Sequence, residues 1–307
     1  MWGKWKSLIN FAGMKRKIVI GVLKCIALLP MRVLYTISDL GYLLIYYLVG
    51  YRRKVVRRNL TEAFPEKTPK EIKKIEKEFY HFMADIIVET VKLLHISDAE
   101  LQKRVAILNP ETVTESVKAG RCAVLMMAHY GNWEWVQEIS RCFDDDSFKT
   151  SIYHPLNSTL WNDIYMRLRG RWKVTLIPQK EAAKKLLNRD NQPWICGFIA
   201  DGRPHTRIRT GDNKTPFLNH NTSFIVGPEV IGKKVGADVF FLEMERVKRG
   251  YYAITFHPLI PQADSLPYPY TRAFWQEFEK VVNKKPAYWL WSHKRWKYDA
   301  VCEKDEF

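Results

Sequence analysis

Short apolar runs alternate with helical patterns from residue 121 onward, and this alternation constrains the fold more than any other feature of the chain. The runs have the length and the aromatic and β-branched content of strands, and they cover 122–128, 148–153, 174–177, 194–200, 239–244 and 251–256. Helical patterns fill the intervals at 133–142, 160–169, 180–187, 224–232 and 270–283. Because strands that alternate with helices usually form a sheet covered by those helices, we predict an α/β fold with a mixed, largely parallel sheet flanked by helices.

A long amphipathic helix is predicted before this alternation. Thr68 is a good N-cap, Pro69 stands at the first helical position, and Glu71 lies three residues after the cap. His95 is expected to follow the end of this helix, just before a new N-cap at Ser97. Apolar residues recur at helical spacing, as in a helix that faces a core; they are Ile72, Ile75, Phe79, Phe82, Met83, Ile86, Ile87 and Val91.

Positive charge is concentrated at the N-terminal end. The chain of 307 residues has a formal net charge of +16, and residues 1–60 supply +11 of it from twelve Lys and Arg side chains and one acid. Basic clusters at 15–17 and 52–54 enclose an apolar stretch over 18–51. The longest uncharged run in that stretch has twelve residues, 40–51. A helix that crosses a bilayer needs ~18–20.

We therefore predict that residues 1–60 form an apolar, basic helical arm that lies in, or dips into, one membrane leaflet. Lys and Arg side chains would meet anionic headgroups there. A soluble helical hairpin packed against the main domain is the alternative. Residues 61–307 would form the α/β domain.

The high aromatic content, 13% with eleven Trp, narrows the anionic partner to a membrane surface or a nucleic acid. Trp and basic residues are interleaved at 289–297, a pattern found on surfaces that stack nucleic-acid bases and also at membrane interfaces. Since the N-terminal stretch is apolar, we favour a lipid surface and expect no nucleic acid.

Motifs for metal and cofactor chemistry are missing from the sequence. The five cysteines are far apart, without a C-x-x-C spacing, and neither an H-E-x-x-H nor a G-x-S-x-G motif occurs. A near-match to a phosphate-binding loop, 227–234, has Lys234 where Ser or Thr would hold magnesium. We expect no metal and no cofactor.

The candidate site is the segment 128–134. His129 directly follows an apolar strand, Gly131 allows a tight turn, Asn132 is a good N-cap, and Glu134 falls in the first turn of the next helix. Ligands of open α/β sheets bind beyond the carboxyl ends of the strands. A His–carboxylate pair suits acyl transfer to a hydroxyl, since neutral imidazole takes the hydroxyl proton while the carboxylate fixes its tautomer.

The spacing of His129 and Glu134 is weak support by itself. His95 and Glu100 repeat it, although His95 follows a helix and is expected to be structural. A buried strand-end histidine and an ordinary carboxylate near a helix N-terminus would also produce this pattern.

Four motifs, in order along the chain, resemble the bacterial lipid A biosynthesis acyltransferases, within the wider glycerolipid acyltransferase superfamily. They lie at 57–65, 128–134, 153–155 and 286–297, so that the resemblance covers about 20–298. It implies an inner-membrane enzyme on the cytoplasmic face that moves a fatty acyl chain from acyl carrier protein to a hydroxyl of a lipid A precursor. It also implies a catalytic dyad of His129 and Glu134. Arg167 or Arg169 would bind phosphate or developing negative charge.

Two departures from the family pattern affect the substrates more than the reaction. Asp201 is followed by Gly202 where the family usually has Gln, and His154 replaces the Arg of a Tyr-Arg-Pro motif. Asp201 is expected among the polar groups that contact acceptor or donor. Another lyso- or hydroxy-lipid as acceptor and coenzyme A as donor stay open, as does a non-enzymatic, membrane-bound basic protein.

Overall fold

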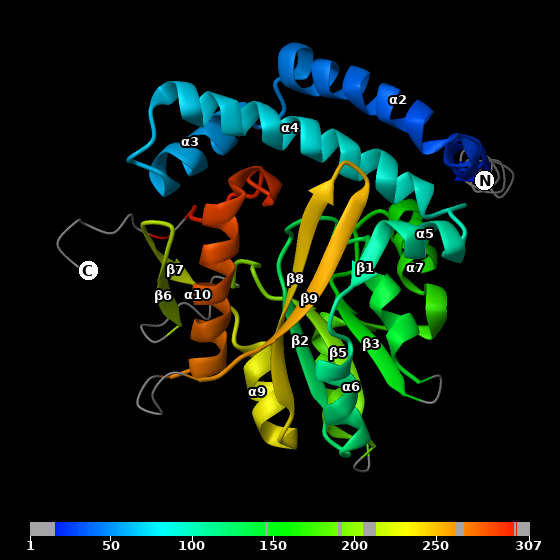
Figure 1. The fold of residues 1–307 in the computed structure, drawn as a ribbon, viewed down its shortest axis with the longest axis vertical. Helices are drawn as coiled ribbons and strands as arrows, with labels where there is room; N and C mark the ends of the chain where they lie inside the picture. Colours follow the sequence, from blue (N-terminus) through cyan, green and yellow to red (C-terminus); the bar gives the residue numbers. More distant parts are fainter. Residues whose placement is uncertain are drawn as a thin grey trace, which may run out of the picture.

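The computed structural model describes residues 16–144, 147–189, 192–204, 213–261, 267–297 and 299. Within these ranges a seven-stranded sheet has the order β1-β9-β8-β2-β5-β3-β4, and a two-stranded sheet pairs β6 with β7 (Figure 1). The strands are β1 (Val105–Ile107), β2 (Ala123–Met127), β3 (Phe148–Tyr153), β4 (Thr175–Pro178), β5 (Trp194–Ile199), β6 (Lys214–Phe217), β7 (His220–Ser223), β8 (Asp238–Lys248) and β9 (Tyr251–Pro258).

The large sheet is mostly parallel. From β8 to β4 all neighbouring strands run parallel, β9 returns antiparallel along β8, and β1 is parallel to β9. Every predicted strand is present. The sequence prediction missed β1, β6 and β7, which have only three or four residues each and contain no long apolar run. The predicted mixed α/β fold is confirmed.

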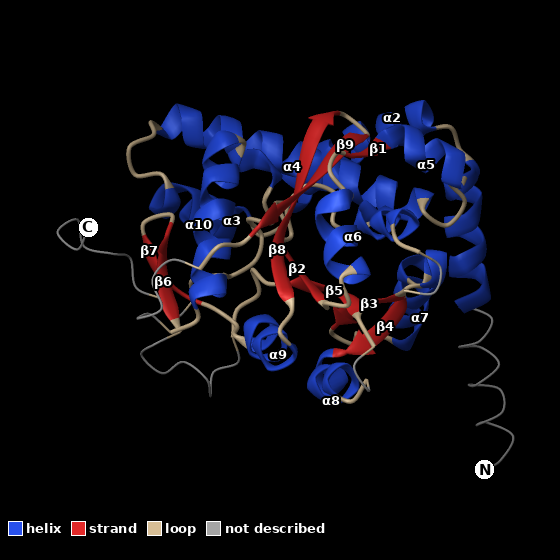
Figure 2. Cartoon of the chain, turned by 60° about the horizontal axis from the view of Figure 1, so that its bottom comes forward, coloured by secondary structure: helices blue, strands red, loops and turns tan. Residues whose placement is uncertain are grey.

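Helices cover both faces of this sheet and its upper end (Figures 1 and 2). The α-helices are α2 (Met31–Leu43), α3 (Arg53–Ala63), α4 (Pro69–Lys92), α5 (Asp98–Arg104), α6 (Glu111–Lys118), α7 (Thr159–Arg169), α8 (Ala182–Leu187), α9 (Gly227–Val235) and α10 (Pro269–Lys284). A π-helix, η1 (Leu44–Val49), continues α2, and short 3₁₀ helices are η2 (Trp135–Cys142), η3 (Arg171–Lys173), η4 (Gln179–Glu181) and η6 (Pro286–Tyr288). The helix predicted at 133–142 is thus a 3₁₀ helix that begins two residues later.

Side chains of β2 alternate between two hydrophobic cores, one on each face of the sheet. Val124, Met126 and Ala128 belong to the core beneath α9 and α10. Leu125 and Met127 belong to the other, which contains residues of α5, α6 and α7. Burial on both faces explains why β2 is an uninterrupted apolar run.

The tryptophan-rich C-terminal segment lies in the first of these cores. Trp289, Trp291 and Trp296 are at most 4% exposed and pack edge-on against one another and against Phe217 and Phe278. Their interpretation as a membrane-interface anchor is therefore wrong. The interleaving of Trp with basic residues arose because the rings face inward while Lys294 and Lys297 face solvent.

Helix α4 lies across the carboxyl ends of the parallel strands, and α2 packs on its outer side (Figure 1). The predicted capping box is formed: Thr68 Oγ1 accepts from the N–H of Glu71, and the Glu71 carboxylate accepts from the N–H of Thr68. Most apolar residues of the predicted stripe are buried, but Ile87 is 50% exposed. Ile87 is thus an apolar side chain of α4 that does not pack in either core.

The N-terminal arm is bent. Helices Arg16–Leu28 and Met31–Val49 meet at 117°, and among the described residues no single helix is long and apolar enough to span a membrane, although this pair passes the same test together. Residues 1–15 of the predicted arm lie outside the described ranges. The proposed boundary at residue 60 falls within α3 and stays a prediction.

One face of the arm is fixed to the domain and the other is open. Leu34 and Ser38 of α2 are buried, and Ser38 donates a 2.6 Å hydrogen bond to Asp85 of α4. Apolar side chains on the remaining surface of the arm are 41% to 80% exposed; they include Val33, Ile37, Leu40, Leu43, Leu44 and Leu48.

Lys92 stabilises the bend of the arm. Its ammonium group, at the end of α4, donates 2.9 Å hydrogen bonds to the carbonyl oxygens of Ala27 and Leu29. These carbonyls lie where the first helix ends and have no later turn to bind. Lys92 is 9% exposed, and burial lowers the pKa of its ammonium group.

We predict that Lys92→Met loosens the helix over residues 16–28. The substitution keeps the apolar stem but leaves two carbonyls without their donor, at a cost of about 1–3 kcal/mol. Amide hydrogen exchange in residues 16–28 should accelerate accordingly. Lys74→Met, on the exposed side of the same helix, is the control. Unchanged exchange in the Lys92 variant would contradict the role of this side chain.

Candidate active site

The register of two neighbouring strands brings His129 and Asp201 together. Parallel strands β2 and β5 pair with Met127 opposite Ile199, and the pairing continues with a 2.7 Å hydrogen bond from the N–H of Ala200 to the carbonyl oxygen of Met127. His129 and Asp201 each follow two residues after this Met127–Ile199 pair. They therefore lie side by side at the carboxyl edge of the sheet.

Asp201 holds His129 through two hydrogen bonds. His129 Nδ1 lies 2.9 Å from Asp201 Oδ1, and the His129 backbone N–H donates to Asp201 Oδ2 at 3.0 Å. The indole N–H of Trp289 donates to Asp201 Oδ2 at 2.9 Å. Burial opposes ionisation of Asp201, but the charge and hydrogen bonds of His129, together with Trp289, hold the pKa of this carboxyl at about 2.

These contacts fix the tautomer of the imidazole. Asp201 is ionised at neutral pH and only accepts hydrogen bonds, so that Nδ1 of neutral His129 carries the proton and Nε2 is left with a lone pair. Burial lowers the pKa of His129, but Asp201 and then Glu134 outweigh burial and raise this pKa above its ordinary value. The side chain of His129 is 33% exposed. Nε2 is therefore the group available for proton transfer.

The turn after His129 is tightly packed. Gly131 has φ +60°, and a Cβ there would lie 2.2 Å from the carbonyl oxygen of Met244 in β8. Asn132 Oδ1 accepts from the N–H of Trp135 and so stabilises the turn. The N-cap of the 3₁₀ helix is Glu134 and not the predicted Asn132, because the helix begins later than expected. The N–H of Gly131 donates to the backbone carbonyl oxygen of Tyr288, and the N–H of Leu290 donates to that of His129, both at 3.1 Å.

Glu134 is bound by Arg169, whereas His129 is bound by Asp201. Arg169 of α7 donates two hydrogen bonds to the Glu134 carboxylate, 2.9 Å and 2.5 Å long, and the indole N–H of Trp133 adds a third at 3.2 Å. Glu134 is 3% exposed. No hydrogen bond joins His129 to Glu134 in the part of the chain that the structure describes. The direct pairing that we expected is absent from this conformation, and the catalytic roles of both residues stay predictions.

The structure separates the two candidate arginines. Arg169 is partly buried, and its pKa, which burial lowers, is raised by the hydrogen bonds and charge of Glu134. Arg167 lies on the exposed side of α7 and does not line the cavities described below. Of the pair, only Arg169 reaches the site.

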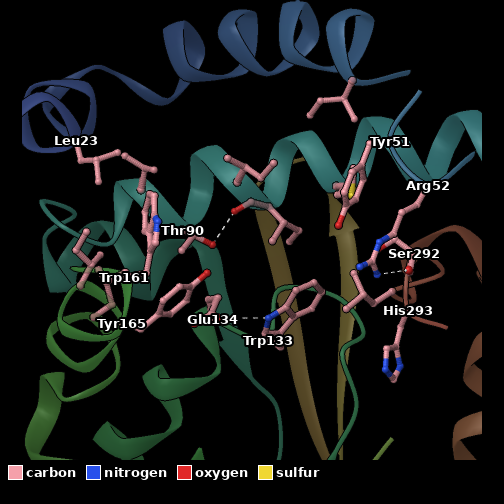
Figure 3. Close-up of a pocket in the computed structure, with 18 of the residues that line it drawn as sticks. Leu23, Tyr51, Arg52, Thr90, Trp133, Glu134, Trp161, Tyr165, Ser292 and His293 are labelled. Carbon is pink, nitrogen blue, oxygen red and sulfur yellow. Dashed lines mark hydrogen bonds between the residues drawn. The ribbon is translucent and has the colours of Figure 1, made fainter. Parts of the chain in front are cut away.

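An apolar cavity of about 770 Å³ lies beneath α4 (Figure 3). Its walls come from α4, α7 and the N-terminal arm, and they explain the exposure of Ile87. In Figure 3, Glu134 and Trp133 lie side by side on the wall away from the α4 residue Thr90, with Tyr165 and Trp161 next to them. Apolar side chains that line the cavity include Leu23, Ile45, Met83, Ile87, Val91 and Ile164.

A more polar cavity of about 700 Å³ adjoins the apolar one. His129 and Arg169 line it, with polar side chains from the segment before α7 and from the first turn of α7: His154, Asn157, Ser158 and Asn162. The two cavities share a wall made of Trp133, Glu134, Trp161, Tyr165 and Leu290. His129 thus lines the polar cavity, and one wall of that cavity also belongs to the apolar cavity.

Other reactive groups lie away from these cavities. Cys122 and Cys196 are buried in the sheet, and burial raises the pKa of both thiols. Cys302 lies outside the described ranges. Among the described residues, no group of three or more His, Cys, Asp or Glu side chains is arranged to hold a metal ion. His293, which lines the apolar cavity, was not predicted; burial lowers its pKa to about 4, so that it is neutral at pH 7.

Comparisons with known proteins identify the family of this chain. The family described as bacterial lipid A biosynthesis acyltransferase matches residues 4–298. The lipid A biosynthesis palmitoleoyltransferase of Escherichia coli (strain K12) is 21% identical over 262 residues, which cover 82% of this chain and 81% of that protein. The lipid A biosynthesis acyltransferase of Shigella flexneri has the same identity and coverage.

The fold and the family match together define the class of protein as an acyltransferase. Since the match spans nearly the whole chain, the chain belongs to the bacterial lipid A biosynthesis acyltransferase family. The resemblance that the four motifs indicated is confirmed.

We predict that Asp201→Asn lowers the pKa of His129. The carboxylate charge raises this pKa in the wild type, and the amide removes that charge at nearly constant shape. A pH titration followed by NMR of the imidazole measures the shift. Glu243→Gln, which alters the partner of His257 instead, should leave His129 unchanged. An unaltered His129 titration in the Asp201 variant would contradict the assigned pairing.

Proposed function

We propose that this protein transfers a fatty acyl chain from acyl carrier protein to a hydroxyl group of a lipid A precursor. The observation that carries the proposal is the position of His129 Nε2, held by Asp201 in a polar cavity that shares a wall with an apolar one. The apolar volume lies within the range of ordinary ligand pockets, ~300–1,000 Å³. An apolar cavity suits such a reaction, because the donor and the lipid acceptor both carry acyl chains.

His129 acts as the general base of the proposed reaction. Nε2 takes the proton of the acceptor hydroxyl as its oxygen attacks the carbonyl carbon of the donor thioester. The C–S bond then breaks, the proton passes to the thiolate, and the new ester bond remains on the acceptor. Asp201 keeps Nδ1 protonated and stabilises the imidazolium while it exists.

Glu134 and Arg169 support the same step from the shared wall. Glu134 raises the pKa of His129 through its charge. Arg169 holds Glu134 and brings a positive charge to the polar cavity, where a phosphate group or the developing oxyanion would sit. In this proposal Asp201 orients the base, a different role from the substrate contact that the sequence suggested.

Transfer is direct in this proposal, without an acyl-enzyme. A covalent route needs a nucleophile beside an activating base. Cys122, Cys142 and Cys196 all have a raised thiol pKa because they are buried, and none lines either cavity. Kinetics with both substrates should therefore be sequential.

The arm and the net charge support a location on the cytoplasmic face of the inner membrane. The exposed apolar side chains of α2 and η1 form one surface, and residues 1–60 carry most of the net positive charge. Apolar area buried among lipid chains and basic groups near anionic headgroups both favour binding. The +16 charge would also attract an acidic carrier protein.

We predict that His129→Ala reduces acyl transfer by ~10²–10⁴-fold, the range for loss of a general base. The assay combines purified protein, a radiolabelled acyl carrier protein donor and a detergent-dispersed lipid A precursor. His95→Ala is the control, because His95 lies beyond α4 and lines neither cavity. Comparable activity in the His129 variant and the wild type would refute the proposed base.

Mass spectrometry of lipids from cells with and without the protein names the acceptor. A missing acyl chain on lipid A supports the proposal. If that chain is missing from another hydroxy-lipid, the reaction class holds and the acceptor changes.

We predict that Leu40→Glu combined with Leu48→Glu moves the protein from the membrane fraction toward the soluble fraction. These side chains are 63% and 80% exposed on the arm, and a charge there cannot enter a lipid surface without cost. Ile260→Glu is the matched control, since Ile260 is 78% exposed but follows β9 at the end of the sheet away from α2 (Figure 1). Retention of the double variant would show that another surface binds the membrane.

A further inference from the structure

Glu89, near the C-terminal end of α4, has no exposed surface and no part in the proposed chemistry. Three side chains from different elements donate to its carboxylate. Tyr35 of α2 donates to Oε1 at 2.8 Å, while Tyr252 of β9 and Asn132 of the active-site turn donate to Oε2 at 2.7 Å and 2.6 Å. The backbone carbonyl oxygen of Glu89 also accepts from the indole N–H of Trp135 at 3.0 Å.

The contact with Asn132 reaches the active site directly. Asn132 Oδ1 faces the N–H of Trp135, which can only donate, so that the amide has one possible orientation and Nδ2 must point at Glu89. Asn132 lies in the chain between His129 and Glu134. A shift of this side chain would move the turn that presents both.

Burial of a carboxylate costs more free energy than burial of an apolar side chain of similar size. Ionised groups lose their hydration when buried, and well-packed apolar side chains are often at least as stabilising. Glu89 keeps three donors converged on one point, which an apolar side chain cannot do. Its partners join the outer helix α2, the sheet and the turn after His129.

The charge of Glu89 depends on every element around it. Burial, the largest effect, and Asp85 of α4 raise its pKa, whereas the hydrogen bonds of Tyr252 and Tyr35 and the charge of Arg246 of β8 lower it. The net result is a pKa of about 7. Asn132 and Tyr252 both donate to Oε2, so a proton on Oε1 faces Tyr35, whose hydroxyl is able to accept. Ionised and protonated Glu89 therefore both keep the hydrogen bond from Asn132.

We propose that Glu89 is a positioning residue for acyl transfer, which acts through Asn132 to hold the turn that carries His129 and Glu134. The inference rests on the proposed function. Tyr35 extends the same linkage to α2, the helix whose outer face carries exposed apolar side chains.

The first experiment compares kcat and KM of Glu89→Ala, Glu89→Gln and the wild type in the acyl-transfer assay. Glu89→Ala should lower kcat by about 10²-fold, the usual effect of a small misplacement, with little change in KM. Glu89→Gln should recover most of kcat, because its amide oxygen accepts from Asn132 and Tyr252 and its NH₂ donates to Tyr35. Between about pH 4.5 and 7, Glu89 holds a proton in the native state but not in the unfolded state. The free energy of unfolding of the wild type should therefore fall as pH rises through this range, and it should fall less steeply in Glu89→Gln.

Glu229→Ala is the matched control. Glu229 is also fully buried, and its carboxylate accepts from the N–H and hydroxyl of Thr271, both at 2.8 Å, at the start of α10. This variant should lose stability but keep the kcat of the wild type per folded molecule. An equal loss of kcat in the Glu89 and Glu229 variants would reduce Glu89 to a structural residue and overturn the inference.

A swap of hydrogen-bond polarity tests the linkage even if Glu89→Ala does not fold. Asn132→Asp keeps the oxygen that accepts from Trp135 but sets two carboxylates against each other, and kcat should fall. Adding Glu89→Gln restores a donor on the opposite side, and kcat should recover by at least tenfold. Failure of the double variant to recover overturns the inference. Absence of acyl transfer in the wild type would instead refute the proposed function.

Discussion

The active site depends on one register of strand pairing. A parallel ladder matches Met127 with Ile199, and the residues that follow, His129 and Asp201, then meet without any loop to guide them. A slip by one residue would turn one of the two side chains toward the opposite face of the sheet. Since β2 is buried on both faces and packs into two cores, such a slip would also misplace every apolar side chain of the strand. The same burial that stabilises the sheet therefore fixes the base and its carboxylate.

The sequence was sufficient for the strands that supply this register and for the residues at their ends. Apolar runs revealed β2 and β5. His129 was recognised as a candidate because it stands directly after a strand, and Asp201 because of the family resemblance. The pairing of His129 with Asp201 was missed, because the order of strands in a sheet depends on tertiary structure. The local sequence does not indicate that β5 lies beside β2. The resemblance implied that Glu134 pairs with His129, but Arg169 of α7 binds the Glu134 carboxylate instead. The C-terminal tryptophans were misjudged for a similar reason, since composition does not tell which face of a segment is inside.

A polar layer joins the N-terminal arm to the domain. Arg249, at the tip of the β8–β9 hairpin, donates to Asp39 of α2 and to Asp85 of α4, while Arg246 also binds Asp85. Glu89 and Lys92 extend these contacts from Asp85 toward the C-terminal end of α4. Hydrogen bonds between buried charged groups require specific geometry, whereas apolar contacts tolerate sliding. The arm thus has a defined orientation on the domain even though its outer surface is apolar.

The apolar residues of α4 have two separate roles: some stabilise the core, and others form the wall of the apolar cavity. Phe79, Phe82 and Ile86 are buried, so substitutions there change the free energy of unfolding. Ile87 is half exposed on the cavity side, with Met83 and Val91 beside it on the same wall. Changes at these positions alter the volume of the cavity while the core keeps its contacts. Substitutions there therefore change the length of ligand that fits the cavity without bringing the protein closer to its stability threshold.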